Sequence, residues 1–370
     1  MPVNLEEKIS LAVKAGKLYN LDHFHRAWKN PSLKRLMGNE LLYPPSPKVI
    51  KAVQRAAAQL QYYPEDPGTA AELKDAIAEY LGIEGGKEWI TLGNGSMEII
   101  DMLPRTFLNP GDEVLLPSPE YSPYSRRPLL YGGVIVDVVP SGGEFTYSLE
   151  DFTSRINSRT KMVILSRPNA PVGNMVPIDL IESLLCEDLI LVVDEAYAEF
   201  SGQSICPMLK DHNNLIISRT FSKAMGLGGI RLGVAVAQPK IIEFIEHIRV
   251  PLNVSQLTQV AAMAALKDLG YIQGNVKKVT QSRDYFYEKV KEVPGIKAYQ
   301  SHGNFVLINC LETGIVAEIF RKNLMEKGYL VRNLSGNRGL DGEYFFRVTI
   351  GKQEDMESVL EIINATAKAG

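Results

Sequence analysis

The stretch LIISRTFSKAMGLGGIRLG, residues 215–233, joins a short apolar run to a single lysine and a glycine-rich segment. The run Leu215–Ile217 predicts a short buried strand, so the Lys223 ammonium should emerge at its carboxyl end. In open α/β sheets, ligands bind at that edge. A lysine in such a water-poor crevice can lose its proton and attack a carbonyl, forming a Schiff base. We therefore predict that Lys223 carries an aldehyde cofactor, although most lysines are solvated surface charges.

The order of patterns along the chain predicts an α/β protein with two domains. From about residue 69 to residue 254, helical patterns alternate with short apolar runs such as EWITLG, EVLLPSP, KMVILSRP and LILVVDEAY. This alternation is typical of βαβ units around a mainly parallel sheet. Later helices lead to separated strands, NFVLINC, YLVRNL and YFFRVTIG, which indicate a smaller α+β domain. We expect residues 1–45 to join the small domain, 46–254 to form the large domain, and 255–370 to form the small C-terminal domain.

Composition favours a globular enzyme that acts on small molecules. Hydrophobic residues make up 45% of the 370 residues, charged residues make up 22%, and the formal net charge is −3. The chain shows no polybasic footprint for nucleic acid or an anionic membrane, and it has no apolar run long enough for a membrane span. The three cysteines lack metal-type spacing, so we expect no metal site and a reducing compartment. The charged N-terminus does not resemble a signal peptide, and we expect a cytoplasmic protein.

The stretch TLGNGSMEII, residues 91–100, predicts an anion site. A strand end, a glycine turn and a helix start together present free backbone N–H groups and the positive end of a helix dipole. We expect the N–H groups of Gly95, Ser96 and Met97, together with the Ser96 hydroxyl, to hold a phosphate. A tight turn without a ligand is the alternative that this motif alone leaves open.

A second predicted strand ends in an acidic residue. In LILVVDEAYAEF, residues 189–200, Asp194 follows an apolar run and should reach the same sheet edge as Lys223. A buried carboxylate that faces a pyridine nitrogen would keep it protonated, and a protonated ring is a strong electron sink. The Tyr197 hydroxyl could then bond the phenolate oxygen of the ring. A metal ligand or a loop cap is the alternative role for Asp194.

Three further stretches offer side chains to a bound ring or to its phosphate. SPEYSPY places Tyr121 and Tyr124 in a proline-shaped loop, where one could stack on a flat ring while the other packs in the core. In RPNAPVG, Asn169 could donate to a ligand oxygen. Arg231, in the glycine-rich segment after the lysine, could clamp a phosphate bidentately.

Together these motifs match a known family. The order GNGSMEIID, SPEYSPY, RPNAPVG, DEAYAEF, SRTFSKAMGLGGIRLG and FRVTIG resembles the fold-type I pyridoxal-phosphate aminotransferases, and within them the histidinol-phosphate aminotransferase-like group. The resemblance implies a three-layer α/β/α large domain with a mainly parallel sheet, plus a smaller α+β domain. It implies pyridoxal 5'-phosphate as cofactor and a homodimer with shared active sites. The implied reaction moves an amino group from a donor, such as histidinol phosphate or an amino acid, to a 2-oxo acid such as 2-oxoglutarate.

The resemblance also implies roles for individual residues. Lys223 is similar to the Schiff-base lysine, Asp194 to the partner of the pyridine nitrogen, and Tyr197 to the partner of the phenolate oxygen. Tyr121 matches the ring-stacking residue, and Tyr63 resembles a tyrosine that reaches the phosphate of the neighbouring subunit. The residues that match the phosphate cup are Ser96, Met97, Thr220, Ser222 and Arg231. Those that match substrate positions are Arg347, for a carboxylate, and Arg332 and Tyr43, for the distal end.

This chain departs from the family pattern in three places. The usual NPTG reads APVG, so Ala170 stands where an asparagine normally touches the phenolate oxygen, and Asn169 is a candidate replacement. Met97 stands where an aspartate is usual, so only its backbone could bind the cofactor. The usual NENPYG reads NELLYP, residues 39–44. These changes lie near the substrate, so they bear on substrate choice more than on the chemistry.

Other functions stay open at this point. A pyridoxal-phosphate decarboxylase similar to threonine-phosphate decarboxylase, or a lyase, would share the fold and cofactor, because the bond that breaks depends on which one is held perpendicular to the ring. A non-enzymatic regulator would need an added DNA-binding module, for which the chain has neither a basic N-terminal domain nor spare length.

Overall fold

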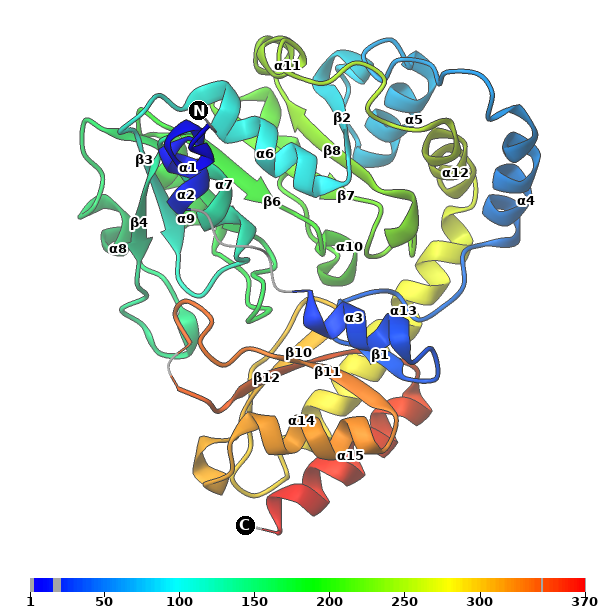
Figure 1. The fold of residues 1–370 in the computed structure, drawn as a ribbon, viewed down its shortest axis with the longest axis vertical. Helices are drawn as coiled ribbons and strands as arrows, with labels where there is room; N and C mark the ends of the chain where they lie inside the picture. Colours follow the sequence, from blue (N-terminus) through cyan, green and yellow to red (C-terminus); the bar gives the residue numbers. More distant parts are fainter. Residues whose placement is uncertain (1–2, 16–20, 341, 370) are drawn as a thin grey trace.

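The computed structural model describes residues 3–15, 21–340 and 342–369; part of the expected N-terminal segment, residues 1–2 and 16–20, lies outside these ranges. The strands of the described residues form two separate sheets, one of seven strands and one of five. Figure 1 shows the larger sheet with its helices in the upper part of the view and the smaller sheet below it. No helix in the described ranges is both long and apolar enough to cross a membrane.

The seven-stranded sheet is mainly parallel, as the alternating pattern predicted. Its strand order is β2-β8-β7-β6-β5-β3-β4, and only β8 runs antiparallel to its neighbours. The central strands are nearly continuous buried apolar runs, because helices cover both faces of the sheet. The strands are β2 (Ile90–Asn94), β3 (Glu113–Pro117), β4 (Val134–Val138), β5 (Thr160–Ser166), β6 (Ile190–Asp194), β7 (Leu215–Thr220) and β8 (Leu232–Ala237).

Helices on both faces complete a three-layer α/β/α domain. Successive residues of a strand point to opposite faces, so Leu115 and Val163 belong to one core cluster while Val114 and Met162 belong to another. The first cluster includes residues of α4 (Pro47–Ala56), α5 (Ala71–Leu81), α8 (Leu149–Thr153), α9 (Ile178–Leu185) and α12 (Gln256–Leu266). The second includes residues of α6 (Ser96–Phe107), α7 (Pro123–Leu129) and α11 (Pro239–Glu246).

The five-stranded sheet has the order β1-β11-β12-β10-β9 and is antiparallel except for the β1–β11 pair. Through β1, the N-terminal segment adds the edge strand of this sheet. Its strands are β1 (Lys34–Leu36), β9 (Lys297–Ala298), β10 (Phe305–Asn309), β11 (Tyr329–Asn333) and β12 (Phe345–Thr349). The other helices are α1 (Leu5–Lys8), α2 (Leu11–Ala15), α3 (Asp22–Lys29), α10 (Ala198–Ser201), α13 (Leu269–Val290), α14 (Ala317–Glu326) and α15 (Gln353–Ala367). Short 3₁₀ turns are η1 (Ala57–Gln59), η2 (Gly86–Trp89), η3 (Gly143–Phe145), η4 (Cys206–Lys210), η5 (Gly228–Ile230) and η6 (Leu311–Thr313).

Helix α12 packs with the large domain rather than with the small one. Ala261 and Ala265 are buried in the core cluster that α4 and α5 share. The following helix, α13, spans both cores, because Ile272 lies in the large-domain cluster and Phe286 in the small-domain cluster. The expected boundary after residue 254 therefore separates α12 from its packing partners. A helical pattern marks an apolar face but does not say which sheet that face meets.

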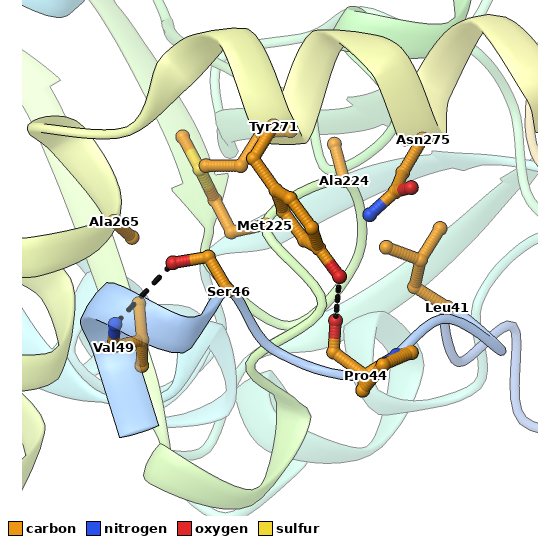
Figure 2. A pocket seen from close by; sticks show the side chains of 10 residues that line it. Leu41, Pro44, Ser46, Val49, Ala224, Met225, Ala265, Tyr271 and Asn275 are labelled. Atoms are coloured by element: carbon orange, nitrogen blue, oxygen red, sulfur yellow. Dashed lines mark hydrogen bonds between the residues drawn. The ribbon is translucent and has the colours of Figure 1, made fainter. Parts of the chain in front are cut away.

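The segment after β1 crosses to the large domain beneath α13. Ser46 caps α4 by accepting a 3.3 Å hydrogen bond from the Val49 N–H, and the Tyr271 hydroxyl donates to the Pro44 carbonyl at 3.0 Å (Figure 2). These residues surround a cavity of about 10 Å³ that Ala224 and Met225 also line. The crossing segment is thereby held against the residues that directly follow Lys223.

Candidate active site

A cavity of about 540 Å³ is lined both by residues at the carboxyl ends of the large-sheet strands and by residues of the small sheet. Asp194 ends β6 and is the register partner of Ser218 in β7, the strand that leads to Lys223. Because β6 and β7 are parallel, both functional side chains reach the same edge of the sheet. The predicted site residues that line the cavity are Lys223, Asp194, Tyr197, Ser96, Met97, Tyr121, Thr220, Ser222, Arg231, Arg332 and Arg347.

The other four predicted site residues do not line this cavity. Gly95 directly precedes the lining residue Ser96. Asn169 is 2% exposed, and its amide is bonded to Pro119 of another loop and to Val172 of its own loop. Tyr43 packs against the small-domain core cluster. Tyr63 is 87% exposed, so it contributes nothing to the site of its own chain.

The Asp194 carboxylate is buried and held in one orientation. Its Oδ2 accepts a 2.6 Å hydrogen bond from the Tyr124 hydroxyl, and its Oδ1 accepts a 3.0 Å bond from the Ala196 N–H. Burial raises the pKa of Asp194 to about 6, although both hydrogen bonds and the Lys223 charge act to lower it. A cation placed beside this carboxylate would favour its ionised form.

Tyr124 is therefore a site residue that the sequence analysis did not assign. The sequence placed one of Tyr121 and Tyr124 in the core, and Tyr124 is indeed 2% exposed. Its hydroxyl nevertheless reaches Asp194, because α7 covers the face of the sheet to which Tyr124 points. The Tyr121 ring meets the Tyr124 ring edge-on, with the centroids 5.5 Å apart, and lines the cavity.

Lys223 contacts Tyr197 and the N-terminal segment at Gly38. Its Nζ donates to the Gly38 carbonyl at 2.9 Å and lies 5.7 Å from the centre of the Tyr197 ring. The Tyr197 ring in turn packs edge-on against Phe305 of β10, with the centroids 5.1 Å apart. The lysine is thus enclosed by elements of both domains.

The start of α6 and Arg231 lie together at the place where the sequence predicts an anion site. As first-turn residues of α6, Ser96 and Met97 have no carbonyl partner for their N–H groups within the helix. The Gly95 N–H instead donates to the Gly93 carbonyl at 2.8 Å, which corrects the expectation that it faces a phosphate. A Cβ at Gly95 would collide with the Arg231 guanidinium, so only glycine allows this approach.

Residues of β7 and of the turn after it lie beside the Arg231 guanidinium. Arg231 has a left-handed backbone, with φ of 59°, and its Nη1 donates to the Gly228 carbonyl at 3.0 Å and to Ser222 Oγ at 3.4 Å. Thr220 Oγ1 accepts a 3.1 Å bond from the Ser222 N–H. Thr220 and Ser222 line the cavity, as does Arg231, and the Thr220 hydroxyl donates to the Leu232 carbonyl at 3.3 Å.

A second cationic region lies at the small-domain end of the cavity. Arg332 of β11 and Arg347 of β12 are register partners on adjacent antiparallel strands. Arg347 Nη2 donates to the Met37 carbonyl at 3.3 Å, and the His23 ring of α3 contacts the Arg332 guanidinium. Burial, together with the charges of Arg332 and Arg347, lowers the pKa of His23 to about 4. The imidazole is therefore neutral near pH 7. Helix α3 forms a wall of this region, which no pattern in the sequence predicted.

The altered loop around residue 170 presents a methyl group to the cavity. Ala170 lines the cavity, whereas Asn169 does not. Asn169 Nδ2 donates to the Pro119 carbonyl at 3.3 Å, and its Oδ1 accepts a 3.1 Å bond from the Val172 N–H. The Asn169 amide is committed within the protein, so the structure gives no support to Asn169 as the replacement donor.

The cavity residues fit a flat cofactor that carries an aldehyde, a ring nitrogen and a phosphate. A buried carboxylate with a raised pKa suits a pyridinium partner, and the cradle at Gly95, with Arg231 beside it, suits a phosphate. Lys223 offers an amine for the aldehyde. This combination of fold and site defines the class of enzymes that depend on pyridoxal phosphate.

Comparison with known proteins identifies the family. The family model described as aminotransferase class I and II matches residues 34–363. The chain is 35% identical over 336 residues to a histidinol-phosphate aminotransferase of Methanothermobacter thermautotrophicus, covering 90% of this chain and 89% of that protein. A relative of the same name from Ruminiclostridium cellulolyticum is 34% identical over 98% of both chains.

Solved structures share the fold. The histidinol-phosphate aminotransferase of Sinorhizobium meliloti in complex with pyridoxal-5'-phosphate has a TM-score of 0.86 at 24% identity, covering 98% of both chains. The Thermus thermophilus aspartate aminotransferase has a TM-score of 0.83 at 23% identity, covering 97% of this chain and 99% of that chain.

The chain belongs to the aminotransferase class I and II family and is a pyridoxal-phosphate-dependent aminotransferase that acts on small-molecule amino donors and 2-oxo acids. The fold class, the cofactor and the reaction class predicted from the sequence are thereby confirmed. The decarboxylase and lyase alternatives are not favoured, because the relatives are named as aminotransferases.

Proposed function

We propose that this aminotransferase moves the amino group of histidinol phosphate to a 2-oxo acid such as 2-oxoglutarate. Relatives that align with most of the chain are named for this donor. The observation that carries the proposal is the pair Arg332 and Arg347, which line the cavity from adjacent strands. A guanidinium binds phosphate or carboxylate as a planar fork, so the pair suits both a phosphorylated donor and a dicarboxylic acceptor.

The cofactor would be held at its ring nitrogen, its ring oxygen, its ring face and its phosphate. When bound, pyridoxal phosphate supplies a protonated ring that withdraws electrons from the α-carbon of the substrate. Asp194 would hold the ring nitrogen, since Tyr124 fixes the orientation of its carboxylate. Tyr197 would donate to the ring oxygen, and Tyr121 would stack on the ring. The phosphate would bind Ser96, Met97, Thr220, Ser222 and Arg231.

Lys223 is the proposed proton carrier. Its Nζ takes the proton from the α-carbon of the amino donor as a general base, and it returns a proton as a general acid in the second part of the exchange. The bond to the Gly38 carbonyl and the neighbouring Tyr197 ring would hold the amine in place for this role.

The proposed assembly is a cytoplasmic homodimer with shared active sites, with neither nucleic acid nor membrane as a partner. Tyr63 is 87% exposed in the single chain, and the nearby Tyr62 and Leu60 are 68% and 57% exposed. Neighbouring exposed apolar side chains are typical of an interface, and a second copy would cover them while Tyr63 reaches its phosphate site. Light scattering should report a dimer, and a monomer that retains full activity would contradict the shared site.

The test of the donor compares two amino compounds in single-turnover experiments. The bound cofactor should be converted by histidinol phosphate, and Arg332→Ala should slow this reaction by about 10- to 150-fold, the equivalent of about 1.5–3 kcal/mol for one charge-assisted bond. The same variant should slow glutamate less, whereas Arg347→Ala should impair both donors. Equal losses for both donors in Arg332→Ala, or no reaction with histidinol phosphate, would contradict this donor. Release of ammonia or carbon dioxide in place of an oxo product would contradict transamination itself.

A further inference from the structure

Asn39, the first residue of NELLYP, lies in the wall of the active-site cavity. It is 1% exposed, and its backbone is left-handed, with φ of 52°. Among residues with a side chain, asparagine tolerates this conformation best. Its Nδ2 donates a 2.9 Å hydrogen bond to the Tyr197 hydroxyl oxygen. The N-terminal segment thus places an amide on a tyrosine of the large domain.

Thr349 determines which way the Asn39 amide points. The Thr349 hydroxyl accepts a 3.0 Å bond from the Asn39 N–H and donates a 3.0 Å bond to Asn39 Oδ1. Rotating the amide by half a turn would leave the buried Thr349 proton without its acceptor. The Asn39 carbonyl also accepts a 3.2 Å bond from Asn304 Nδ2. The Nδ2 atom therefore faces Tyr197 and serves as a donor.

This arrangement decides what the Tyr197 hydroxyl can do. A tyrosine hydroxyl has a single proton, and Asn39 uses one of its acceptor positions. The proton itself is not used by Asn39, so it is available to an acceptor in the cavity that Tyr197 lines. A hydroxyl that accepts one bond also donates a stronger one. Asn39 thus leaves the Tyr197 hydroxyl free to donate its proton into the cavity.

The chain lacks another donor that the family usually has at this place. Ala170 offers only a methyl group, and the Asn169 amide is bonded to the Pro119 carbonyl. A ring oxygen beside Tyr197 would therefore depend on that tyrosine more heavily than in relatives with an asparagine at residue 170. Among the described residues, Tyr197 would then be the main hydrogen-bond donor to this oxygen, and the strength of its bond would set how readily the oxygen attracts a proton.

We propose that Asn39 is a positioning residue, which directs and strengthens the hydrogen bond from Tyr197 to the ring oxygen of pyridoxal phosphate. The inference rests on the part of the proposed function that gives Tyr197 this contact, and it does not depend on the identity of the amino donor. A ring oxygen that receives a stronger hydrogen bond attracts the neighbouring proton less. The pH midpoint of the absorbance change of the bound cofactor is therefore lower with Asn39 than without it.

The test is an absorbance titration of the holoenzyme in the absence of substrate. Asn39→Gly keeps the left-handed backbone available and removes the amide. It should raise the midpoint by about 0.5–1 pH unit, the size expected for one hydrogen bond. Tyr197→Phe should raise it further, and Asn39→Gly added to Tyr197→Phe should cause no additional shift. An unchanged midpoint in Asn39→Gly, or the same shift in both backgrounds, would overturn the inference.

A second substitution keeps the test decisive if the glycine variant does not fold. Asn39→Asp has nearly the same shape but presents an oxygen that draws the Tyr197 proton away from the cavity, so the midpoint should rise at least as far. Asn169→Ala tests the rival donor, and a shift there with none at Asn39 would overturn the inference. A wild-type protein that shows no cofactor absorbance would overturn the proposed function and this inference together. A normal absorbance band with a midpoint insensitive to Asn39 would overturn this inference alone.

Discussion

Removing the charge of Asp194 should change how the stability of the cofactor-free protein depends on pH. The perturbation is Asp194→Asn, which keeps the shape of the side chain but cannot titrate. In the wild type, the carboxylate is buried among Tyr124, Ala196 and Lys223, and burial raises its pKa from 3.8 to about 6. An unfolded chain returns the same carboxyl to water, where its ordinary pKa applies.

The size of the effect follows from these two pKa values. Between about pH 4 and pH 6 the folded protein binds a proton that the unfolded chain has released, so this group makes the protein less stable as the pH rises. The folded and unfolded pKa values of Asp194 differ by about two units, which corresponds to about 3 kcal/mol in the free energy of unfolding. This stabilisation is present at low pH and is lost in full above pH 6. Asparagine has one acceptor oxygen instead of two, so it loses one of the two bonds that Asp194 accepts from Tyr124 and Ala196, which costs about 1–2 kcal/mol at every pH. We therefore expect Asp194→Asn to be less stable than wild type near pH 4 and more stable by about 1–2 kcal/mol at pH 7.

Urea unfolding of the cofactor-free proteins between pH 4 and pH 8 measures this crossover. Asp188→Asn, which replaces an exposed aspartate in the turn before β6, is the control and should follow the wild type at every pH. With pyridoxal phosphate bound, the order should reverse, because the wild-type carboxylate then has a cationic partner. If the stability difference between Asp194→Asn and wild type stays constant from pH 4 to pH 8, the desolvation argument is refuted.

Three further perturbations test neighbouring parts of the molecule. Tyr124→Phe removes the hydroxyl that bonds the buried Asp194 carboxylate, and it should lower kcat/KM by about 10- to 100-fold, the effect expected for one charged hydrogen bond. An unchanged kcat/KM would contradict the positioning role of Tyr124. Lys223→Ala should abolish turnover, and borohydride should no longer fix pyridoxal phosphate to the protein; a label recovered on another lysine would end this assignment. Glu195→Gln weakens the buried ion pair with Arg219 and should lower the free energy of unfolding by about 3 kcal/mol in urea, whereas Glu243→Gln, in an exposed pair, should leave it nearly unchanged. Equal effects of these last two substitutions would show that burial does not decide the strength of the pair.

Much of the candidate site is predictable because its residues stand next to strand ends. Asp194 and Lys223 follow buried apolar runs, and parallel strands bring such positions to one edge whatever their distance along the chain. The anion site at Ser96 is equally local, since a glycine turn and the helix that follows it create it. These features depend on hydrophobic patterning and turn chemistry, and both can be read from short stretches.

Several contacts cannot be predicted in this way because they join residues that are far apart in the sequence. The hydrogen bond between Tyr124 and Asp194 spans 70 positions, and the bond between Asn39 and Tyr197 spans 158. The contact between His23 and Arg332 spans 309 positions. Each depends on the exact docking of a helix or a crossing segment, and no local pattern encodes that distance.

Local patterns in the sequence predict the class of fold, the two kinds of sheet, the lysine and carboxylate at the sheet edge, and the family, because strand periodicity, glycine turns and motif order are local properties of the chain. The packed structure was needed to show that α12 belongs to the large-domain core, that the Asn169 amide is bonded to the Pro119 carbonyl of a separate loop, and that Asn39 reaches Tyr197. Those outcomes depend on which apolar surfaces meet and on how every buried polar group finds a partner, and both are settled only when the whole chain is packed.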